Sequence, residues 1–232
     1  MRGYEVTNEQ WERIKPLLPK QGKVGRPRAD DRMVLNGILY VLRTGCRWKD
    51  MPREYGAYVT AWRRLKQWQQ EGVWTRIWRT FLAELDEDGK IKWARAFLDG
   101  SFVPAKRGGE EIGLTKVGKG TKRMVTTDGE GIPLAFLLAA ANHAEVKLAP
   151  MTLDRVRVPR RRGRPRKRPE ELVADRAYDS DRFRAWLRSK GIRPCIPPRK
   201  NRKDKRRRKT WEQEYKERWH VERTLATSCQ VV

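Results

Sequence analysis

Residues 94–109 read ARAFLDGSFVPAKRGG, and the fold of the second half of the chain depends on this stretch. A short, mainly apolar run, Ala94–Leu98, leads directly into Asp99, which Gly100 and Ser101 follow. An apolar run of this length, bounded by turn-forming residues, favours a β-strand. We therefore expect a strand that ends at Asp99, where a sheet meets a loop.

A second apolar run leads into another acidic residue in the same way. Leu172–Ala174 precedes Asp175 in the segment LVADRAYDSDRFRAWL, residues 172–187. If these two strands are neighbours in one sheet and end together, Asp99 and Asp175 lie close to each other. An Asp after a strand is also a common turn former or helix cap, so neither residue alone indicates a site.

The elements expected after residue 90 are typical of a mixed α/β sheet. Two apolar runs flank DGEG at 128–131, which predicts a β-hairpin. Because the first three strands are successive hairpin partners, this sheet differs from a doubly wound parallel one. The remaining expected elements are helices at about 145–156 and 179–190, a strand at 192–196, and a last helix from about 211 that carries Glu222.

Residues 1–90 are expected to form a separate helical domain, and residues 91–232 the mixed α/β domain. In the first domain, apolar residues recur at three- and four-residue spacing between turn signals. Short helices joined by turns, with exposed basic residues, are typical of a helix-turn-helix-like DNA-binding module. A small helical bundle that serves only as a scaffold has the same pattern. The basic residues expected to face DNA are Arg63, Arg64 and Lys66.

The charge balance indicates a polyanionic partner. The chain of 232 residues contains 54 Lys and Arg but 29 Asp and Glu, a formal net charge of +25. Each phosphate that such a protein neutralises releases a condensed counterion, so nucleic acid is the favoured partner. Structural RNA-binding proteins share this charge. Two basic segments, 157–169 and 199–209, the second of which includes Arg199 and Lys200, are expected to be exposed loops that contact phosphates.

Other classes of protein are disfavoured by the sequence. The three cysteines are widely spaced and lack metal-ligand spacing, which is typical of a reduced, cytoplasmic protein. The N-terminal residues have no continuous apolar core like that of a signal peptide. The longest apolar stretch, Ile132–Ala141, is too short to span a bilayer and contains Pro133. We therefore expect no membrane association.

Three carboxylates, Asp99, Asp175 and Glu222, form the candidate catalytic and metal-binding set. Converging carboxylates repel one another strongly unless cations lie between them. Mg²⁺ prefers such hard oxygen ligands together with water and substrate phosphate. Two ions can activate the attacking oxygen and stabilise the leaving oxygen of a displacement at phosphorus.

Three blocks of sequence resemble the catalytic blocks of DDE transposases: FLDGSFVPAKRGG at 97–109, LVADRAYDSDRFRAWL at 172–187 and YKERWHVERT at 215–224. Residues 25–52 and 62–74 are similar to the short helical N-terminal domain of the IS-five-like group of bacterial insertion sequences.

The resemblance implies an RNase H-like catalytic domain and a DDE triad of Asp99, Asp175 and Glu222. It also implies two Mg²⁺ or Mn²⁺ ions, double-stranded DNA of transposon ends and target as partner, and a homo-oligomer when active. In the last block, Tyr215 and Arg218 match residues that accompany the Glu, and offsets of three and four residues place all three on one helical face. Arg218 is therefore expected to hold a DNA phosphate, and Tyr215 either contacts the DNA backbone or packs.

After Thr224 the chain departs from the pattern of that family. The family continues as a long helix rich in aromatic and basic residues, whereas residues 225–232 read LATSCQVV. This favours a C-terminally truncated or frameshifted copy with an incomplete last helix. Two interpretations follow: an active transposase, or an inactive DNA-binding derivative that regulates or inhibits the full-length enzyme.

Overall fold

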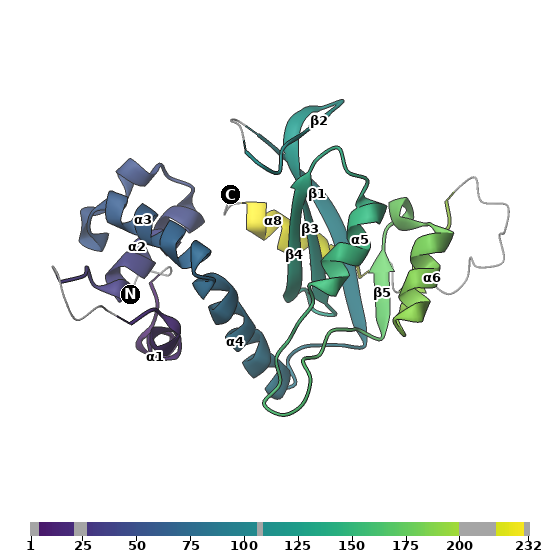
Figure 1. Ribbon diagram of the computed structural model, residues 1–232, viewed down its shortest axis with the longest axis horizontal. Helices are drawn as coiled ribbons and strands as arrows, with labels where there is room; N and C mark the ends of the chain where they lie inside the picture. Colours follow the sequence, from purple (N-terminus) through teal and green to yellow (C-terminus); the bar gives the residue numbers. More distant parts are fainter. Residues whose placement is uncertain (1–4, 21–26, 106–108, 200–216, 230–232) are drawn as a thin grey trace. The chain divides into compact units, whose positions relative to one another are not determined.

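The computed structural model describes residues 5–20, 27–105, 109–199 and 217–229 (Figure 1). The chain divides into two compact units. The first contains Met1–Phe81 and Thr227–Val232, and the second contains Leu82–Ala226. Each unit has a hydrophobic core of its own.

The first unit is helical, as expected, and local sequence signals define its helices. Thr7 accepts a hydrogen bond from the backbone N–H of Gln10, and the Gln10 side chain accepts one from Thr7 N in return, which is a capping box. Gly45, in the left-handed conformation with φ of 67°, ends the second helix. The helices are α1 (Asn8–Ile14), α2 (Asp31–Thr44) and α3 (Tyr58–Gln70), with short 3₁₀ helices at Lys15–Leu17, Trp48–Asp50 and Arg53–Tyr55. A further helix, α4 (Val73–Glu87), begins in this unit, and its residues from Leu82 onward belong to the second unit.

The core of this unit explains why one expectation about α3 is wrong. Ala61 and Trp68 are fully buried, and Arg64 lies between them at three- and four-residue offsets. Arg64 is therefore only 9% exposed, and its guanidinium is paired with the carboxylate of Asp31 at the start of α2. The sequence predicted an exposed Arg64, whereas the structure uses this residue to join α2 and α3.

The second unit is built on a mixed six-stranded sheet. Strand β3 pairs antiparallel with β1 along one edge and with β2 and β4 along the other. Along the edge away from β3, strand β1 pairs parallel with β5, and β5 pairs parallel with β6. A meander of antiparallel strands continued by two parallel strands is the RNase H-like arrangement, so the expected fold class is confirmed. The strands are β1 (Arg95–Pro104), β2 (Gly113–Thr115), β3 (Gly118–Asp128), β4 (Pro133–Ala140), β5 (Glu171–Ala174) and β6 (Arg193–Cys195).

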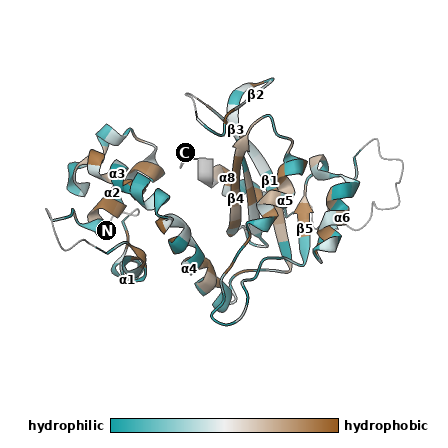
Figure 2. Ribbon diagram, in the orientation of Figure 1, coloured by the Kyte–Doolittle hydropathy of each residue, from teal (hydrophilic) through white to brown (hydrophobic). Residues whose placement is uncertain are grey.

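Helices cover both faces of the sheet (Figure 1). On one face, α5 (Glu145–Asp154) and α6 (Asp181–Ser189) pack on a core that includes Ala96 and Leu98 of β1. On the other face, α8 (Trp219–Cys229) packs on a smaller cluster that includes Phe97. Figure 2 shows the hydrophobic character of β4 and β5 between these layers. Because side chains alternate along a strand, Asp99 is on the α8 side and Gly100 is on the α5 side.

The expectation that a strand ends at Asp99 is wrong. The pairing of β1 with β3 continues without interruption from Ala96↔Asp128 to Pro104↔Gly120, so the ladder carries the strand through Asp99. Gly100 and Ser101, which suggested a turn, are ordinary members of this ladder. By contrast, β5 does end at Ala174, directly before Asp175. The strand β2 was not expected from the sequence.

No helix in the described ranges is long and apolar enough to cross a membrane.

Candidate active site

Parallel strand pairing places Asp99 and Asp175 side by side. In the register of β1 and β5, Leu98 is the partner of Ala174. The next residue on each chain is therefore an Asp, and the two carboxyl groups lie next to each other although 76 positions separate them in sequence. The structure thus brings together two of the three acids singled out in the sequence.

Asp99 lies in an environment that disfavours its charge. Its side chain is 16% exposed. Burial raises the pKa of the Asp99 carboxyl above its ordinary value, and the nearby carboxylates of Asp175 and Glu145 raise this pKa further. The Arg218 guanidinium and a backbone hydrogen bond from Gly100 N at 2.9 Å lower the pKa. A cation beside Asp99 would therefore relieve a cost that the fold imposes on the free carboxylate.

Asp175 has a structural role as well as its place beside Asp99. It caps the 3₁₀ helix Arg176–Tyr178, and its Oδ1 accepts a hydrogen bond from Ala177 N at 2.6 Å. The capping role that the sequence allowed as an alternative is therefore present. This cap fixes the direction of the Asp175 side chain at the end of β5.

Arg218 occupies the position between the acids on the α8 side. Its Nη2 lies 3.1 Å from Asp99 Oδ2 and 3.5 Å from Glu222 Oε1. The Arg218 side chain is 12% exposed, whereas that of Glu222 is 59% exposed. The offset of four residues brings Arg218 and Glu222 together as the sequence predicted. One guanidinium thus bridges two of the carboxylates.

The helix that carries Glu222 is fixed to the sheet at several points. Val221 and Leu225 are buried against Phe97 and its neighbours. Arg123 of β3, itself 4% exposed, donates a hydrogen bond from Nη2 to Leu225 O at 3.0 Å. Thr224 Oγ1 donates to Gly131 O at 2.7 Å. These contacts hold the described part of α8 in place.

Two residues that the sequence did not single out complete the surroundings of the acid pair. The fully buried Tyr178 donates a hydrogen bond from its hydroxyl to Glu145 Oε2 at 3.0 Å. Glu145 Oε1 lies 3.4 Å from Lys122 Nζ. A Cβ atom on Gly100 would lie only 2.9 Å from Glu145 Cδ, so glycine permits this approach to β1. Glu145 therefore links the strand of Asp99 to the turn that follows Asp175.

Only a weak signal in the sequence marks this pair. Tyr178 follows Asp175 by three residues, and Glu145 is the first residue of its helix. Burial, together with the carboxylates of Glu145, Asp99 and Asp175, raises the pKa of the Tyr178 hydroxyl far above its ordinary value, so Tyr178 is a neutral donor here.

The other residues expected to bind DNA have different positions. Tyr215 and Lys200 lie outside the described residues. Arg199 is tied to the turn after Asp175, because its Nη2 donates to Ala177 O at 3.0 Å. Arg63 and Lys66 are exposed on α3, as expected. Lys66 Nζ lies 4.2 Å from the centroid of the Trp62 ring.

The donor chemistry of the acid pair fits Mg²⁺ or Mn²⁺. Asp99 and Asp175 offer hard carboxylate oxygens at one place, and burial and mutual repulsion favour a cation between them. Over the residues that the structure describes, no three or more His, Cys, Asp or Glu are grouped so as to hold a metal ion. Glu222 faces the Arg218 guanidinium in this arrangement.

Comparison with protein families identifies transposase sequences in both units. A family model described as "Transposase DDE domain" matches residues 95–231. Another, described as "Putative transposase of IS4/5 family", matches residues 6–78.

Two similar curated proteins come from an insertion element. The chain is 41% identical over 117 residues to "Insertion element IS402 uncharacterized 16.2 kDa protein" of Burkholderia cepacia, a match that covers 47% of this chain and 80% of that protein. It is 41% identical over 108 residues to "Putative transposase for insertion sequence element IS402" of the same organism, covering 46% of this chain and 48% of that protein. The chain thus matches about half the length of that second relative.

Solved structures with similarity to the chain are distant. The piggyBac transposase synaptic complex with hairpin DNA is 11% identical, with a TM-score of 0.43, covering 87% of this chain and 52% of that chain. The Mos1 strand transfer complex is 12% identical, with a TM-score of 0.30, covering 80% of this chain and 64% of that chain.

Proposed function

The chain belongs to the family of transposases with a DDE domain, and we propose that it binds the terminal inverted repeats of an insertion sequence and catalyses metal-dependent DNA strand cleavage and transfer. The observation that carries this proposal is the pairing of Leu98 with Ala174, which puts Asp99 and Asp175 side by side. Two adjacent carboxylates on a rigid sheet suit a reaction that needs precise placement of a phosphoryl group.

We assign a separate role to each residue of the site. Asp99 and Asp175 would hold the metal ions, with Glu222 as the third acid once Arg218 no longer bridges it to Asp99. When bound, two Mg²⁺ or Mn²⁺ ions would supply activation of the attacking oxygen and stabilisation of the leaving oxygen. Arg218 offers a planar guanidinium that can bind a DNA phosphate through two hydrogen bonds.

The first unit would provide recognition of the DNA ends. Arg63 and Lys66 are exposed on α3 and can reach phosphates or bases. Arg64 has no place in this role while it is buried against Asp31. Strand transfer joins two ends to a target, so the active form would be a homo-oligomer assembled on DNA.

The proposal is tested with purified full-length chain and duplex DNA that carries the ends of the element. We expect nicking at the element boundary in Mg²⁺ or Mn²⁺ and no nicking in excess chelator. A duplex with a scrambled terminal repeat is the matched control, and it should remain uncut. Equal cleavage in chelator would overturn the proposal.

A second candidate function is a DNA-binding derivative that occupies the same ends and inhibits full-length transposase. The 59% exposure of the Glu222 side chain and the bridge through Arg218 favour it, because the three acids are not assembled around one point. Binding of the terminal repeats without any nicking in either metal is the result that would select this function. Strand transfer by the isolated chain would eliminate it.

A further inference from the structure

The connection between α5 and β5 contains a small, very basic hairpin, Val158–Arg166, which we call the basic hairpin. Its sequence is VPRRRGRPR. Two backbone hydrogen bonds, Val158 N to Arg166 O and Arg166 N to Val158 O, both 2.9 Å, close its base. Val158 is fully buried, so the base belongs to the core of the second unit.

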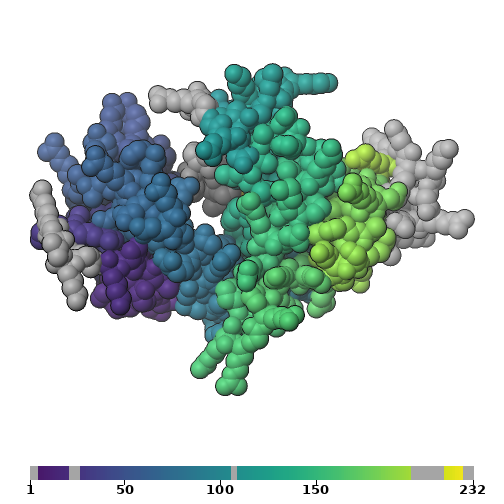
Figure 3. All heavy atoms as spheres, viewed as in Figure 1, coloured from purple at the N-terminus to yellow at the C-terminus, as the bar shows by residue number. Residues whose placement is uncertain are grey.

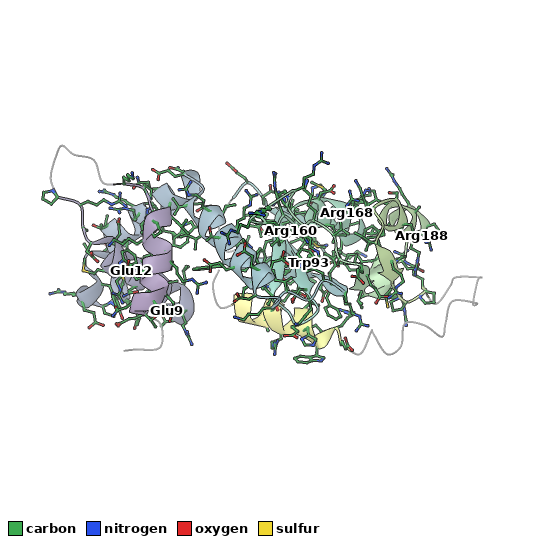
Figure 4. All side chains as sticks on the ribbon, turned by 90° about the horizontal axis from the view of Figure 1, so that it is seen from below. Glu9, Glu12, Trp93, Arg160, Arg168 and Arg188 are labelled. Atoms are coloured by element: carbon green, nitrogen blue, oxygen red, sulfur yellow. The ribbon has the colours of Figure 1, made fainter. Side chains whose placement is uncertain are left out.

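Side chains at the base attach the basic hairpin to the body of that unit. The Arg166 guanidinium lies 4.5 Å from the centroid of the Trp93 ring. Trp93 Nε1 donates to Asp86 Oδ1 at 2.6 Å, and Arg160 Nε lies 3.7 Å from Asp86 Oδ2. Figure 4, seen from below, labels Trp93 and Arg160 in this region together with Arg168.

The tip of the basic hairpin presents arginines without partners. Arg161, Arg162 and Arg164 are exposed, and their side chains make no hydrogen bond or ion pair within the described part of the chain. Gly163 between them has φ of +86°, and a Cβ there would meet nothing within 4 Å. The space-filling view shows this green segment projecting from the lower edge (Figure 3).

The same tetrapeptide occurs earlier in the chain, where its last arginine, the counterpart of Arg166, is paired with an acid. Gly-Arg-Pro-Arg occurs at 25–28 and again at 163–166. In the first copy, Arg28 is paired with Asp31 at 2.8 Å and its side chain is 16% exposed. The tip of the second copy has no acid beside it in the described residues, so its charge is available to a ligand.

The basic hairpin is distant from the acid pair. Four residues separate its end from the start of β5, whereas Asp175 directly follows β5. Four strand residues span about 13 Å, so the two features lie at opposite ends of the parallel strands. A ligand at the tip would therefore be bound in addition to the one at the acid pair.

We propose that the tip of the basic hairpin inserts into the minor groove of A/T-rich double-stranded DNA. The guanidinium groups of Arg162 and Arg164 flank Gly163, which has no side chain, and Pro165 follows. The tip of the basic hairpin is therefore narrow. The minor groove is about 6 Å wide. In A-tracts it is narrower and has a stronger negative potential, which attracts inserted Arg side chains. This proposal rests on the proposed function in one respect only, namely that the partner is double-stranded DNA.

The test measures binding of the full chain to two short duplexes that differ only in a central AATT or GGCC. Wild type should bind the AATT duplex about tenfold more tightly than the GGCC duplex. A change of one base pair in a binding site has an effect of this size on affinity. The variant Arg162→Lys/Arg164→Lys keeps the net charge, so it should keep its affinity for GGCC and lose the preference for AATT. Netropsin, which fills the A/T minor groove, should displace wild type from AATT.

The matched control is Arg182→Lys/Arg188→Lys, two exposed arginines of α6, which should keep the preference. Thermal unfolding verifies that each variant is folded. Equal binding of both duplexes by wild type, or a preference that survives in the hairpin lysine variant, would show phosphate contact alone and overturn the proposal. Preference for AATT without cleavage of element ends would instead reject the proposed function and leave the hairpin proposal standing.

Discussion

The two ends of the parallel strands in the second unit carry side chains of opposite charge. At the end of β5, the acids Asp99 and Asp175 meet, and one arginine, Arg218, is 12% exposed and paired with Asp99. At the start of β5, the basic hairpin presents Arg162 and Arg164 to solvent. The same sheet therefore separates a site that holds negative charge in a partly buried place from one that displays positive charge.

This difference shows that the net charge of the chain does not identify which residues bind DNA or carry out chemistry. A total of +25 indicates a polyanionic partner but not where it binds. Arg64 and Arg123 are counted in that total, yet both are buried and join structural elements. The chemistry depends on the few acids that the topology gathers, and binding depends on the arginines that the topology leaves exposed.

The largest effect should come from removing the acids themselves. Asp99→Ala or Asp175→Ala should lower the rate of end cleavage roughly 1,000-fold or more, as loss of one member of a catalytic set does, and leave DNA binding in place. Single-turnover cleavage and a binding titration measure the two properties separately. Asp154 is an exposed acid at the C-terminal end of α5, and the variant Asp154→Ala is the control, which should cleave normally. Normal cleavage by Asp99→Ala would show that Asp99 has no catalytic role.

The next effect concerns the link between Glu145 and Tyr178. Tyr178→Phe or Glu145→Ala removes the hydrogen bond that joins the start of α5, which lies against Gly100, to the turn after Asp175. Mn²⁺ binding and cleavage should therefore weaken about 10- to 100-fold. Glu145→Gln keeps an acceptor for the Tyr178 hydroxyl, so its Mn²⁺ affinity and cleavage rate should fall much less. Calorimetric titration with Mn²⁺ checks this order. An unchanged Mn²⁺ affinity in Tyr178→Phe would mean that the hydrogen bond serves packing only.

A smaller effect is expected at the arginine between the acids. Without DNA, the Arg218 guanidinium competes with a metal ion for Asp99 and Glu222. Arg218→Ala should therefore tighten Mn²⁺ binding about three- to fivefold, the scale of one partly exposed ion pair. Cleavage should nevertheless fall, because a phosphate ligand is lost. Arg223→Ala, at an arginine five residues further along the chain, is the control. Tighter Mn²⁺ binding in that variant as well would point to a general effect of charge.

The smallest effect is on stability and depends on pH. Burial raises the pKa of Asp99, so the folded state favours the protonated form, and the stability that this group contributes at low pH is lost as pH rises through the raised pKa. Asp99→Asn should then raise the Tm at pH 7 in metal-free buffer by about 2–4 °C, and this difference should vanish in acid. Thermal unfolding at both pH values measures it. Glu222→Gln, at an exposed acid, should change the Tm little. A lower Tm for Asp99→Asn at pH 7 would show that its pairing with Arg218 outweighs burial.

Local signals in the sequence were sufficient for most of the elements. The capping box at Thr7, the end of α2 at Gly45 and the hairpin around residues 128–131 follow from interactions within a few residues. The same rules failed at Gly100 and Ser101, which have the composition of a turn but lie in a ladder with β3. Tertiary pairing there outweighs the local preference, because each residue of the ladder gains backbone hydrogen bonds.

The candidate site was predictable only in part. Asp99 and Asp175 could be singled out because each follows an apolar run, and the resemblance to transposases added Glu222. Neither signal could show that Glu145 contacts Gly100, because these residues are 45 positions apart and come together only through packing of α5 on the sheet. The burial of Arg64 was missed for the same reason, since its partner Asp31 belongs to another helix.

The sequence by itself determined the helical and mixed α/β halves, the positive charge, and the positions of the two Asp residues after apolar runs. Only the tertiary structure decided that Leu98 pairs with Ala174 and that Arg218 lies between Asp99 and Glu222. It also decided that Arg28 is paired with Asp31, whereas Arg162 and Arg164 of the basic hairpin are exposed. Capping and periodicity act over a few residues, whereas strand register and burial depend on contacts between segments far apart in the chain.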